Sequence, residues 1–170
     1  INPHYRHLEF DAFFILLHIF RHYLEEGVGL RQLMDYYMVL TSITDEKTRC
    51  FVQKTLDYFG LTRFSSSIMY VLLRVFEGVE DDEIRDCRNH YEWLISEPDC
   101  KRGRRVLEAV MTSGNFGTSD YRRDEIYKGK NAFVRFLKRE KFYFRNFTDY
   151  AWEVVWLPLL QVKRWRLRND

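Results

Sequence analysis

The chain has 170 residues, of which 46% are hydrophobic and 17% aromatic. This length suffices for one domain with a sizeable core, and the hydrophobic content excludes intrinsic disorder. The 27 lysines and arginines nearly balance the 25 aspartates and glutamates, so no global field favours nucleic acid or a membrane surface as a partner. No apolar run approaches the roughly 20 residues that a membrane helix needs. The three cysteines form no CxxC pattern, which favours free thiols in a reducing cytoplasm over a zinc site.

The first 42 residues predict two helices joined by a short loop. Residues 8–26 form the first helix, because Gly27 follows where a left-handed cap is wanted. Residues 30–42 form the second, and the loop of about three residues between them is typical of antiparallel neighbours. We therefore expect an antiparallel hairpin. Its core is predicted to include Leu17, Phe20, Leu33 and Met34.

The helical period continues along the chain. Thr44 or Asp45 can cap a third helix that ends at Gly60, and the apolar run 68–76, after three serines, predicts a fourth. The acidic cluster 80–83 suits the positive end of a fifth helix. A sixth begins at Pro98-Asp99 and stops at Gly114. The side chains expected to be buried by the fifth and sixth helices are Ile84, Cys87, Tyr91, Leu94, Val106, Leu107, Val110 and Met111.

The last third of the chain is also predicted to be helical. After an irregular loop at 114–117, residues 119–146 are amphipathic, and Thr148 or Asp149 can cap a last helix that Pro158 should kink. No segment shows the alternation of a strand. We therefore expect an all-α fold, with a single helical domain over residues 1–170 and about seven to eight helices.

Four polar residues of the predicted hairpin are candidates for a site. His18 and His22 lie one turn apart in an apolar helix, and Arg31 and Asp35 lie one turn apart in the next helix. In an antiparallel hairpin the two pairs fall at similar heights, so we expect one cluster in which Asp35 approaches the other three. Polar groups in apolar surroundings are satisfied by each other, by a ligand or by another chain. His18, His22 and Asp35 could also hold a metal, although the HExxH pattern is absent. The sequence leaves these alternatives open.

Two acidic groups further along do not fit a catalytic metal centre. Asp120 and Asp124 follow a Gly-Thr-Ser turn, but they stand four residues apart in a helical context. Nucleotidyl transfer needs two carboxylates in D-x-D spacing on a strand, facing the same metal cluster. The acidic run 80–83 fails for the same reason and is predicted to be a solvated helix start.

The segment LLHIFRH…EGVGLRQLMDYYMVL and the Gly-Asn-Phe-Gly loop at 114–117 resemble a family of uncharacterised bacterial nucleotidyltransferases. Genes of this family often lie in polysaccharide-biosynthesis neighbourhoods. Its members look like a polymerase-β-type core followed by a long helical region, and the resemblance falls on that helical region. The positions that carry it are His18, His22, Leu30, Arg31, Asp35, Asn115, Phe116 and Gly117.

The resemblance implies that this chain is the C-terminal part of such an enzyme. Its partner would then be an N-terminal nucleotidyltransferase core, which would carry the Gly-Ser turn and the D-x-D strand and use Mg²⁺ and a nucleoside triphosphate. The chain itself would hold no catalytic residue. The residues implied to face the nucleotide or a small-molecule or saccharide acceptor are His18, His22, Arg31, Asp35 and Asn115.

Two hypotheses about function therefore compete. Because the chain begins with Ile1 and not with Met, we expect a fragment or a processed product, which fits the helical part of a nucleotidyltransferase. The alternative is a non-catalytic helical module that binds a partner protein. An open polar cleft around the four hairpin residues favours the first, and a flat exposed aromatic patch favours the second.

Overall fold

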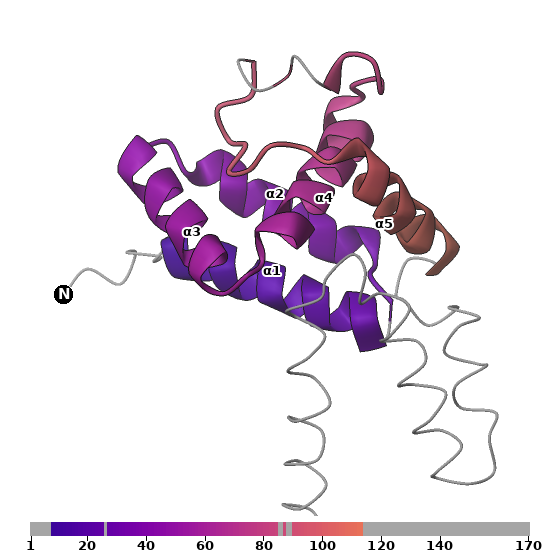
Figure 1. Cartoon of the computed structure of the whole chain (residues 1–170), viewed down its shortest axis with the longest axis horizontal. Coiled ribbons are helices and arrows are strands. Elements are labelled where there is room, and N and C mark those ends of the chain that lie inside the picture. Colours follow the sequence, from indigo (N-terminus) through magenta and orange to yellow (C-terminus); the bar gives the residue numbers. More distant parts are fainter. Residues whose placement is uncertain (1–7, 26, 85–86, 88–89, 114–170) are drawn as a thin grey trace, which may run out of the picture. The chain divides into compact units, whose positions relative to one another are not determined.

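The computed structural model describes residues 8–25, 27–84, 87 and 90–113. The chain divides into two compact units, Ile1–Asp120 and Tyr121–Asp170, and all the described residues belong to the first. Figure 1 shows the α-helices α1 (Leu8–Glu25), α2 (Leu30–Ser42), α3 (Glu46–Tyr58), α4 (Thr62–Leu72) and α5 (Cys100–Ser113). A short π-helix, η1 (Leu73–Glu77), extends α4. These residues contain no strand, which confirms the all-α class for them. The helices predicted after residue 113 lie outside the described residues, and the single domain over 1–170 stays a prediction.

The first two helices form the predicted hairpin. Gly27 has a φ of 90°, and its N–H donates to the His22 carbonyl over 2.7 Å, so the glycine closes α1 in the left-handed conformation that suits it. The Gly29 N–H donates to the side-chain oxygen of Gln32 at the start of α2. Across this short connection α1 and α2 pack on each other, and α3 packs on α1 (Figure 1).

The core lies between α1, α2, α3 and α4. Its largest fully buried side chains are Tyr36, Tyr70, Phe64, Leu16, Ile19, Leu24, Leu33, Leu40, Leu56 and Ile68. Phe20 and Leu33 are buried as predicted, but Leu17 and Met34 are 41% and 47% exposed, so their predicted place in the core is wrong. Leu17 follows the fully buried Leu16, and Met34 follows the fully buried Leu33. Because one step along a helix turns the side chain by about 100°, both point away from the core.

The third helix is capped as predicted. The Thr48 N–H donates to Asp45 Oδ1 over 2.7 Å, which satisfies a free donor at the start of α3. This bond from the backbone lowers the pKa of the Asp45 carboxyl. Gly60, with a φ of 71°, follows the helix as expected.

The fourth helix begins earlier than predicted, because the hydroxyl groups of Ser65 and Ser67 find hydrogen-bond partners while these residues are helical. The Ser67 hydroxyl donates to the Arg63 carbonyl over 2.9 Å, and the buried Ser65 hydroxyl bonds that of Ser96 over 2.7 Å. Such bonds remove the penalty of burying a hydroxyl, so α4 starts at Thr62 rather than at residue 68. The π-helix then ends at Glu77, and Gly78, whose φ is 68°, follows it.

The predicted fifth helix is wrong for the described residues, which form no α-helix between Gly78 and Asp99. Arg74 donates to the Val79 carbonyl and to Glu80, and Asp81 pairs with Arg104, so these acidic residues bind other elements instead of opening a helix. The segment still contributes to the core. Ile84 and Cys87 are buried as predicted, whereas Tyr91 and Leu94 are partly exposed.

The sixth predicted helix is α5. The helix was expected to begin at Pro98-Asp99 and begins at Cys100, where Asp99 Oδ1 caps it by accepting the Arg102 N–H over 2.9 Å. Val106 and Val110 are buried, but Met111 is exposed, which corrects its predicted core position. Helix α5 packs on α4, where Gly103 faces the ring of Tyr70. None of the described helices is long and apolar enough to span a membrane.

Candidate functional site

Helix α1 carries apolar residues on two opposite faces. At about 100° per residue, its buried residues point to one side, and an exposed set of three apolar and two polar residues lies within an arc of about 100° on the other side. We call this set the α1 outer stripe, and it consists of Phe10, Phe14, Leu17, His18 and Arg21. A helix at the surface of a globular protein usually needs only one apolar face, so the outer stripe calls for a separate explanation.

The rings of the α1 outer stripe stack along the helix. Phe10 is 60% exposed and Phe14 54% exposed, and their ring centroids lie 5.8 Å apart with nearly parallel planes. The next ring is that of His18, 6.4 Å from Phe14 and again parallel to it. This succession at a spacing of four residues gives one continuous aromatic surface.

Other aromatic residues of α1 are covered by neighbouring helices, which sets the stripe apart. Phe13 lies 4.8 Å from Phe59 after α3, and Phe20 lies 4.7 Å from Phe64 of α4, both measured between ring centroids. For Phe10 and Phe14, the ring contacts found in the described part of the chain stay within the stripe itself. Their faces therefore present apolar area at the surface.

The two histidines of the predicted cluster contact each other, a contact that was not among the predictions. His22 Nε2 lies 3.0 Å from His18 Nε2, and the rings meet edge to face at 4.3 Å. One nitrogen donates and the other accepts, and which one donates depends on the tautomers of the two rings. Through His18 the pair adds polar atoms to the α1 outer stripe.

Arg31 and Asp35 do not complete the expected cluster by direct bonds. Both side chains are exposed on α2, and within the described ranges no hydrogen bond or ion pair connects Asp35 to His18, His22 or Arg31. The same ranges contain no group of three His, Cys, Asp or Glu side chains placed to hold a metal ion. A shared ligand-facing role of these residues stays a prediction, and Asn115 lies outside the described residues.

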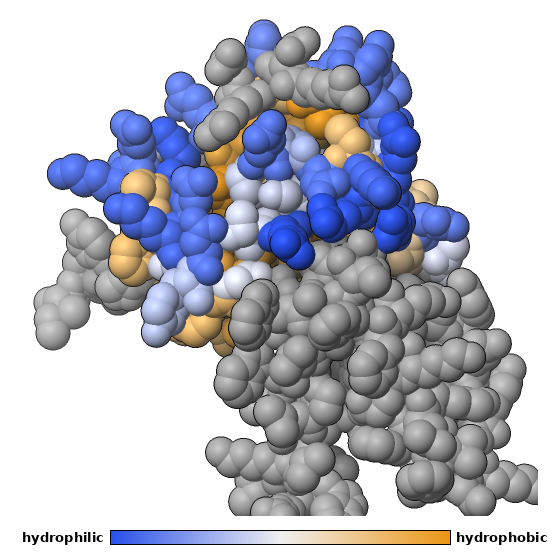
Figure 2. All heavy atoms as spheres, viewed as in Figure 1, coloured by the Kyte–Doolittle hydropathy of each residue, from blue (hydrophilic) through white to orange (hydrophobic). Residues whose placement is uncertain are grey.

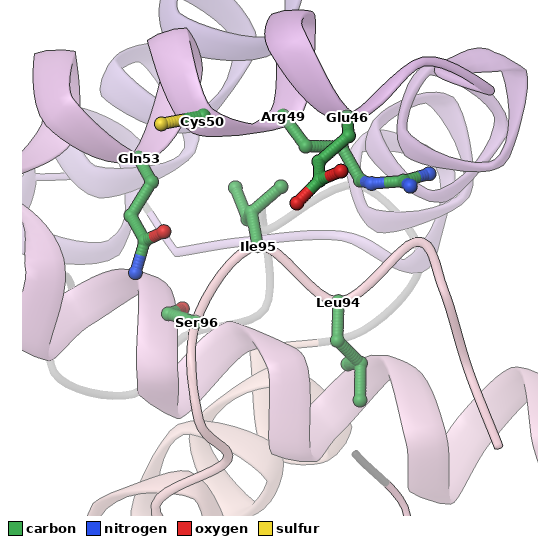
Figure 3. A pocket seen from close by; sticks show the side chains of 7 residues that line it. All are labelled: Glu46, Arg49, Cys50, Gln53, Leu94, Ile95 and Ser96. Carbon is green, nitrogen blue, oxygen red and sulfur yellow. The ribbon is translucent and has the colours of Figure 1, made fainter. Parts of the chain in front are cut away.

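A small pocket lies elsewhere, between α3 and the segment 94–96. It has a volume of about 230 Å³, and Figure 3 shows Gln53 of α3 reaching toward Ser96 while Ile95 points up from the opposite side. Arg49, which also lines it, donates to the carbonyls of Ile43 and Thr44. The pocket is smaller than typical ligand sites, which have about 300 Å³ or more. Its one cationic side chain, that of Arg49, already binds two backbone carbonyls, so the pocket has little to offer a small-molecule ligand.

A second pocket, of about 410 Å³, is lined by Asp81, Asp82, Cys100 and Arg104. Here Arg104 Nε and Nη2 donate to Asp81 Oδ2 over 2.8 and 2.7 Å, and the Tyr70 hydroxyl donates to Asp81 Oδ1 over 2.7 Å. The bond from Tyr70, followed by that from Arg104, lowers the pKa of the Asp81 carboxyl. These bonds connect α4, α5 and the turn after η1, so the group has a structural role that the sequence did not reveal.

Tyr37 connects α2 to η1 and to the segment after it. Its hydroxyl donates to Glu77 over 2.6 Å, and this bond is the main reason why the pKa of Tyr37 rises to about 12. The Tyr37 ring lies 5.1 Å from that of Phe76 and 5.4 Å from that of Trp93. These ring contacts hold Phe76 of η1 and Trp93 of the following segment against α2.

The face of the molecule shown in Figure 2 carries both hydrophilic and hydrophobic side chains. Hydrophilic side chains cover most of α5, and hydrophobic side chains break the surface over α3. Beyond the α1 outer stripe, the exposed large hydrophobic residues are Met34, Met38, Phe51, Tyr58, Phe59 and Met111. The stripe differs from these because its aromatic rings form a stacked row along one helix.

Comparisons with known proteins identified no similar protein. No protein-family model matches the chain, and no curated protein or solved structure is significantly similar to it. The resemblance to nucleotidyltransferases described above thus stays a prediction.

Proposed function

We propose that this chain is a non-catalytic helical module that binds another polypeptide through the α1 outer stripe. The observation that carries the proposal is the exposed stack of Phe10, Phe14 and His18 on a helix that already buries its opposite face. Contiguous exposed apolar surface of this kind marks sites of protein interaction.

The shape of the surroundings supports a polypeptide over a small ligand. The two pockets described above are lined by residues of α3, of α5 and of the segments before α5, and neither includes a residue of the stripe. Enclosed pockets suit small molecules, whereas a convex row of side chains along a helix suits a second helix or an extended segment. The stripe is an exposed aromatic patch, although a convex one, and an exposed aromatic patch is the feature expected of an interaction module.

The apolar area of the stripe is large enough to matter for binding. Full burial of one Phe or Leu side chain contributes about 1.5–3 kcal/mol. Because Phe10, Phe14 and Leu17 are each already about half covered, a partner would gain about 1 kcal/mol from each. A free-energy gain of this size is expected of apolar residues at the centre of an interface of moderate affinity. His18 and Arg21 would then form part of the polar rim of that interface.

The nucleotidyltransferase hypothesis assigns the same hairpin a different role. Under it, Arg31 would meet a phosphate of the nucleotide, and the nucleotide would need Mg²⁺ and a catalytic core. Arg31 is exposed at the start of α2, so its charge is accessible. This hypothesis predicts that binding depends on Arg31, whereas our proposal predicts that binding depends on Phe14.

A selection experiment tests the proposal and does not require the natural partner to be identified first. Amphipathic helical peptides displayed on phage would be selected on the immobilised full chain, and the best peptides measured by titration calorimetry. Phe14→Glu should weaken binding at least about tenfold, equal to about 1.4 kcal/mol. The matched control is Phe51→Glu, which makes the same change at a side chain that is 58% exposed on α3, and it should leave binding unchanged.

The same samples decide between the two hypotheses. Equal binding of the selected peptides to Phe14→Glu and to the wild type would contradict the interaction proposal. Titration with magnesium nucleoside triphosphate forms the second arm. Saturable nucleotide binding that Arg31→Gln abolishes and Phe14→Glu does not would favour the nucleotidyltransferase hypothesis.

A further inference from the structure

The segment from residue 91 to residue 98 lies against α4 and leads to α5 without forming a helix or a strand (Figure 1). We call it the α4 strap. The side chains of Trp93, Ile95 and Ser96 are buried, whereas those of Glu92 and Glu97 are exposed. The strap therefore covers part of the core with single inward-pointing side chains, where the rest of this core is covered by packed helices.

The backbone of the α4 strap is weakly tied to the helices. The N–H groups of Tyr91 and Leu94 donate to the carbonyls of Cys87 and Tyr91, which are local turns. Within the described part of the chain, no backbone hydrogen bond joins the strap itself to a helix. The bond from the Asp99 N–H to the Ser66 carbonyl, over 3.0 Å, lies just beyond the strap and marks its end. A segment tied so loosely is of the kind that opens locally while the rest of the fold stays intact.

Side-chain contacts hold the strap on the helices instead. The Trp93 ring lies 5.4 Å from that of Tyr37 in α2, measured between centroids, and the Ser96 hydroxyl bonds that of Ser65 in α4 over 2.7 Å. Ser65 is fully buried beneath the strap. When Ser96 moves away, water can bond the Ser65 hydroxyl in its place, so this hydrogen bond adds little to the cost of opening. An apolar residue at position 65 would instead oppose exposure to water.

The strap also forms one wall of the pocket in Figure 3. Leu94, Ile95 and Ser96 line the pocket from the strap, and the other lining residues belong to α3. The strap and α3 are thus separated by a hollow at this point. A strap that moves away from α4 therefore gives up few contacts with α3, and the pocket loses a wall.

We infer that the α4 strap is a gate, which opens as a unit while the described helices stay folded. Opening uncovers Ser65 on α4 and turns the pocket beside α3 into an open groove. The chain is held on both sides of the gate. Asp81, before it, accepts hydrogen bonds from Tyr70 and Arg104, and Asp99, after it, caps α5. The inference does not depend on the α1 outer stripe.

Thiol labelling of the folded full chain tests the gate. The native cysteines are first replaced by Cys50→Ser, Cys87→Ala and Cys100→Ser. Single reporter thiols are then introduced by Ile95→Cys in the strap, Ser65→Cys in α4 and Val52→Cys in α3. All three positions are buried, so each thiol reacts with Ellman's reagent when its surroundings open.

The gate predicts two classes of labelling rate. Ile95→Cys and Ser65→Cys should react at similar rates, at least about tenfold faster than Val52→Cys. Urea below the unfolding transition should accelerate Val52→Cys more steeply, because global unfolding exposes more surface than opening of the strap. Urea denaturation of each variant shows that it is folded and gives the global stability with which its labelling is compared.

A further substitution tests the bond that closes the gate. Ser65→Ala in the chain with Ile95→Cys removes the bond to Ser96 and should raise the labelling rate about fivefold. The matched control is Thr55→Ala, which removes a hydroxyl bonded to the Phe51 carbonyl within α3. This control should leave the labelling rate of Ile95→Cys unchanged.

Two results would overturn the inference. Equal labelling rates with equal urea dependence at the three positions would mean that the strap opens only with the whole fold. A fast reaction of Ile95→Cys, with Ser65→Cys as slow as Val52→Cys, would mean that the strap moves without uncovering α4. Neither result bears on the proposed function, which is tested through Phe14.

Discussion

Replacing Gly103 by alanine should destabilise the protein, although alanine is the better helix former. Gly103 is buried within α5, where the helix packs on α4. A Cβ atom at this position would lie 2.5 Å from Tyr70 Cβ and closer still to Cγ and Cδ1. These atoms are at the root of the Tyr70 side chain, so a change of rotamer cannot move all of them away.

The magnitude follows from two opposing terms. Alanine in place of glycine within a helix stabilises it by about 1 kcal/mol. Overpacking of a tight contact typically costs about 1–3 kcal/mol. Here we expect the upper end, because moving α5 away from Tyr70 also disturbs the bonds of Asp81 to Tyr70 and Arg104. The net effect should be a loss of about 2 kcal/mol in the free energy of unfolding.

Urea denaturation of the wild type and the variant measures this loss. A double-mutant cycle with Tyr70→Ala isolates the contribution of the ring, because the cost of Gly103→Ala should fall once Cγ and Cδ1 are removed and only the contact with the Cβ atom of residue 70 remains. Lys101→Ala, at an exposed position of the same helix, is the control and should change stability by less than about 0.5 kcal/mol. A Gly103→Ala variant as stable as the wild type would refute the tight α4–α5 contact.

Three further predictions concern polar groups and activity. Tyr37→Phe removes the hydrogen bond to Glu77 and should lower the free energy of unfolding by about 1 kcal/mol, whereas Tyr36→Phe removes a fully buried hydroxyl that interacts with Ser65 without a hydrogen bond of good geometry and should cost less. Equal losses in the two urea titrations would contradict this. The lowered pKa of Asp81 contributes stability above the usual carboxyl pKa and loses it as pH falls, so Asp81→Asn should flatten the decline in stability below about pH 4; unchanged acid titrations would argue against it. The isolated chain should release no pyrophosphate from nucleoside triphosphates with Mg²⁺, since the D-x-D carboxylate pair is missing from its sequence; turnover in a coupled assay would contradict this.

The sequence predicted the helices whose boundaries are set by local chemistry. Gly27 and Gly60 adopt left-handed conformations at the ends of α1 and α3, and Asp45 and Asp99 cap α3 and α5 through their carboxylates. Each of these signals acts within about four residues of its helix end. The hairpin of α1 and α2 could be predicted for the same reason, since the loop between them is short.

Features that depend on distant partners could not be predicted. The sequence places Glu80 and Asp81 where a helix could begin, but their partners are Arg74 and Arg104. In the same way, Ser65 is tolerated inside α4 because it reaches Ser96, 31 residues away. Local propensity gives way to such tertiary contacts.

The candidate site was found only in part. The sequence predicted a cluster around Asp35; it did not predict the contact between His18 and His22 or the exposed rings of Phe10 and Phe14. A signal was present, because α1 has more apolar residues than one helical face can hold. Which of the two faces would be buried depends on α2, α3 and α4, and the sequence of α1 does not contain that information.

The most direct test of the α1 outer stripe is an amide chemical-shift map of the isotope-labelled full chain, titrated with a selected helical peptide. Our account predicts that the perturbed amides cluster between Phe10 and His22, and that Phe14→Glu removes these shifts while Phe51→Glu retains them. Perturbations centred on α3 or α5, with α1 unaffected, would contradict it.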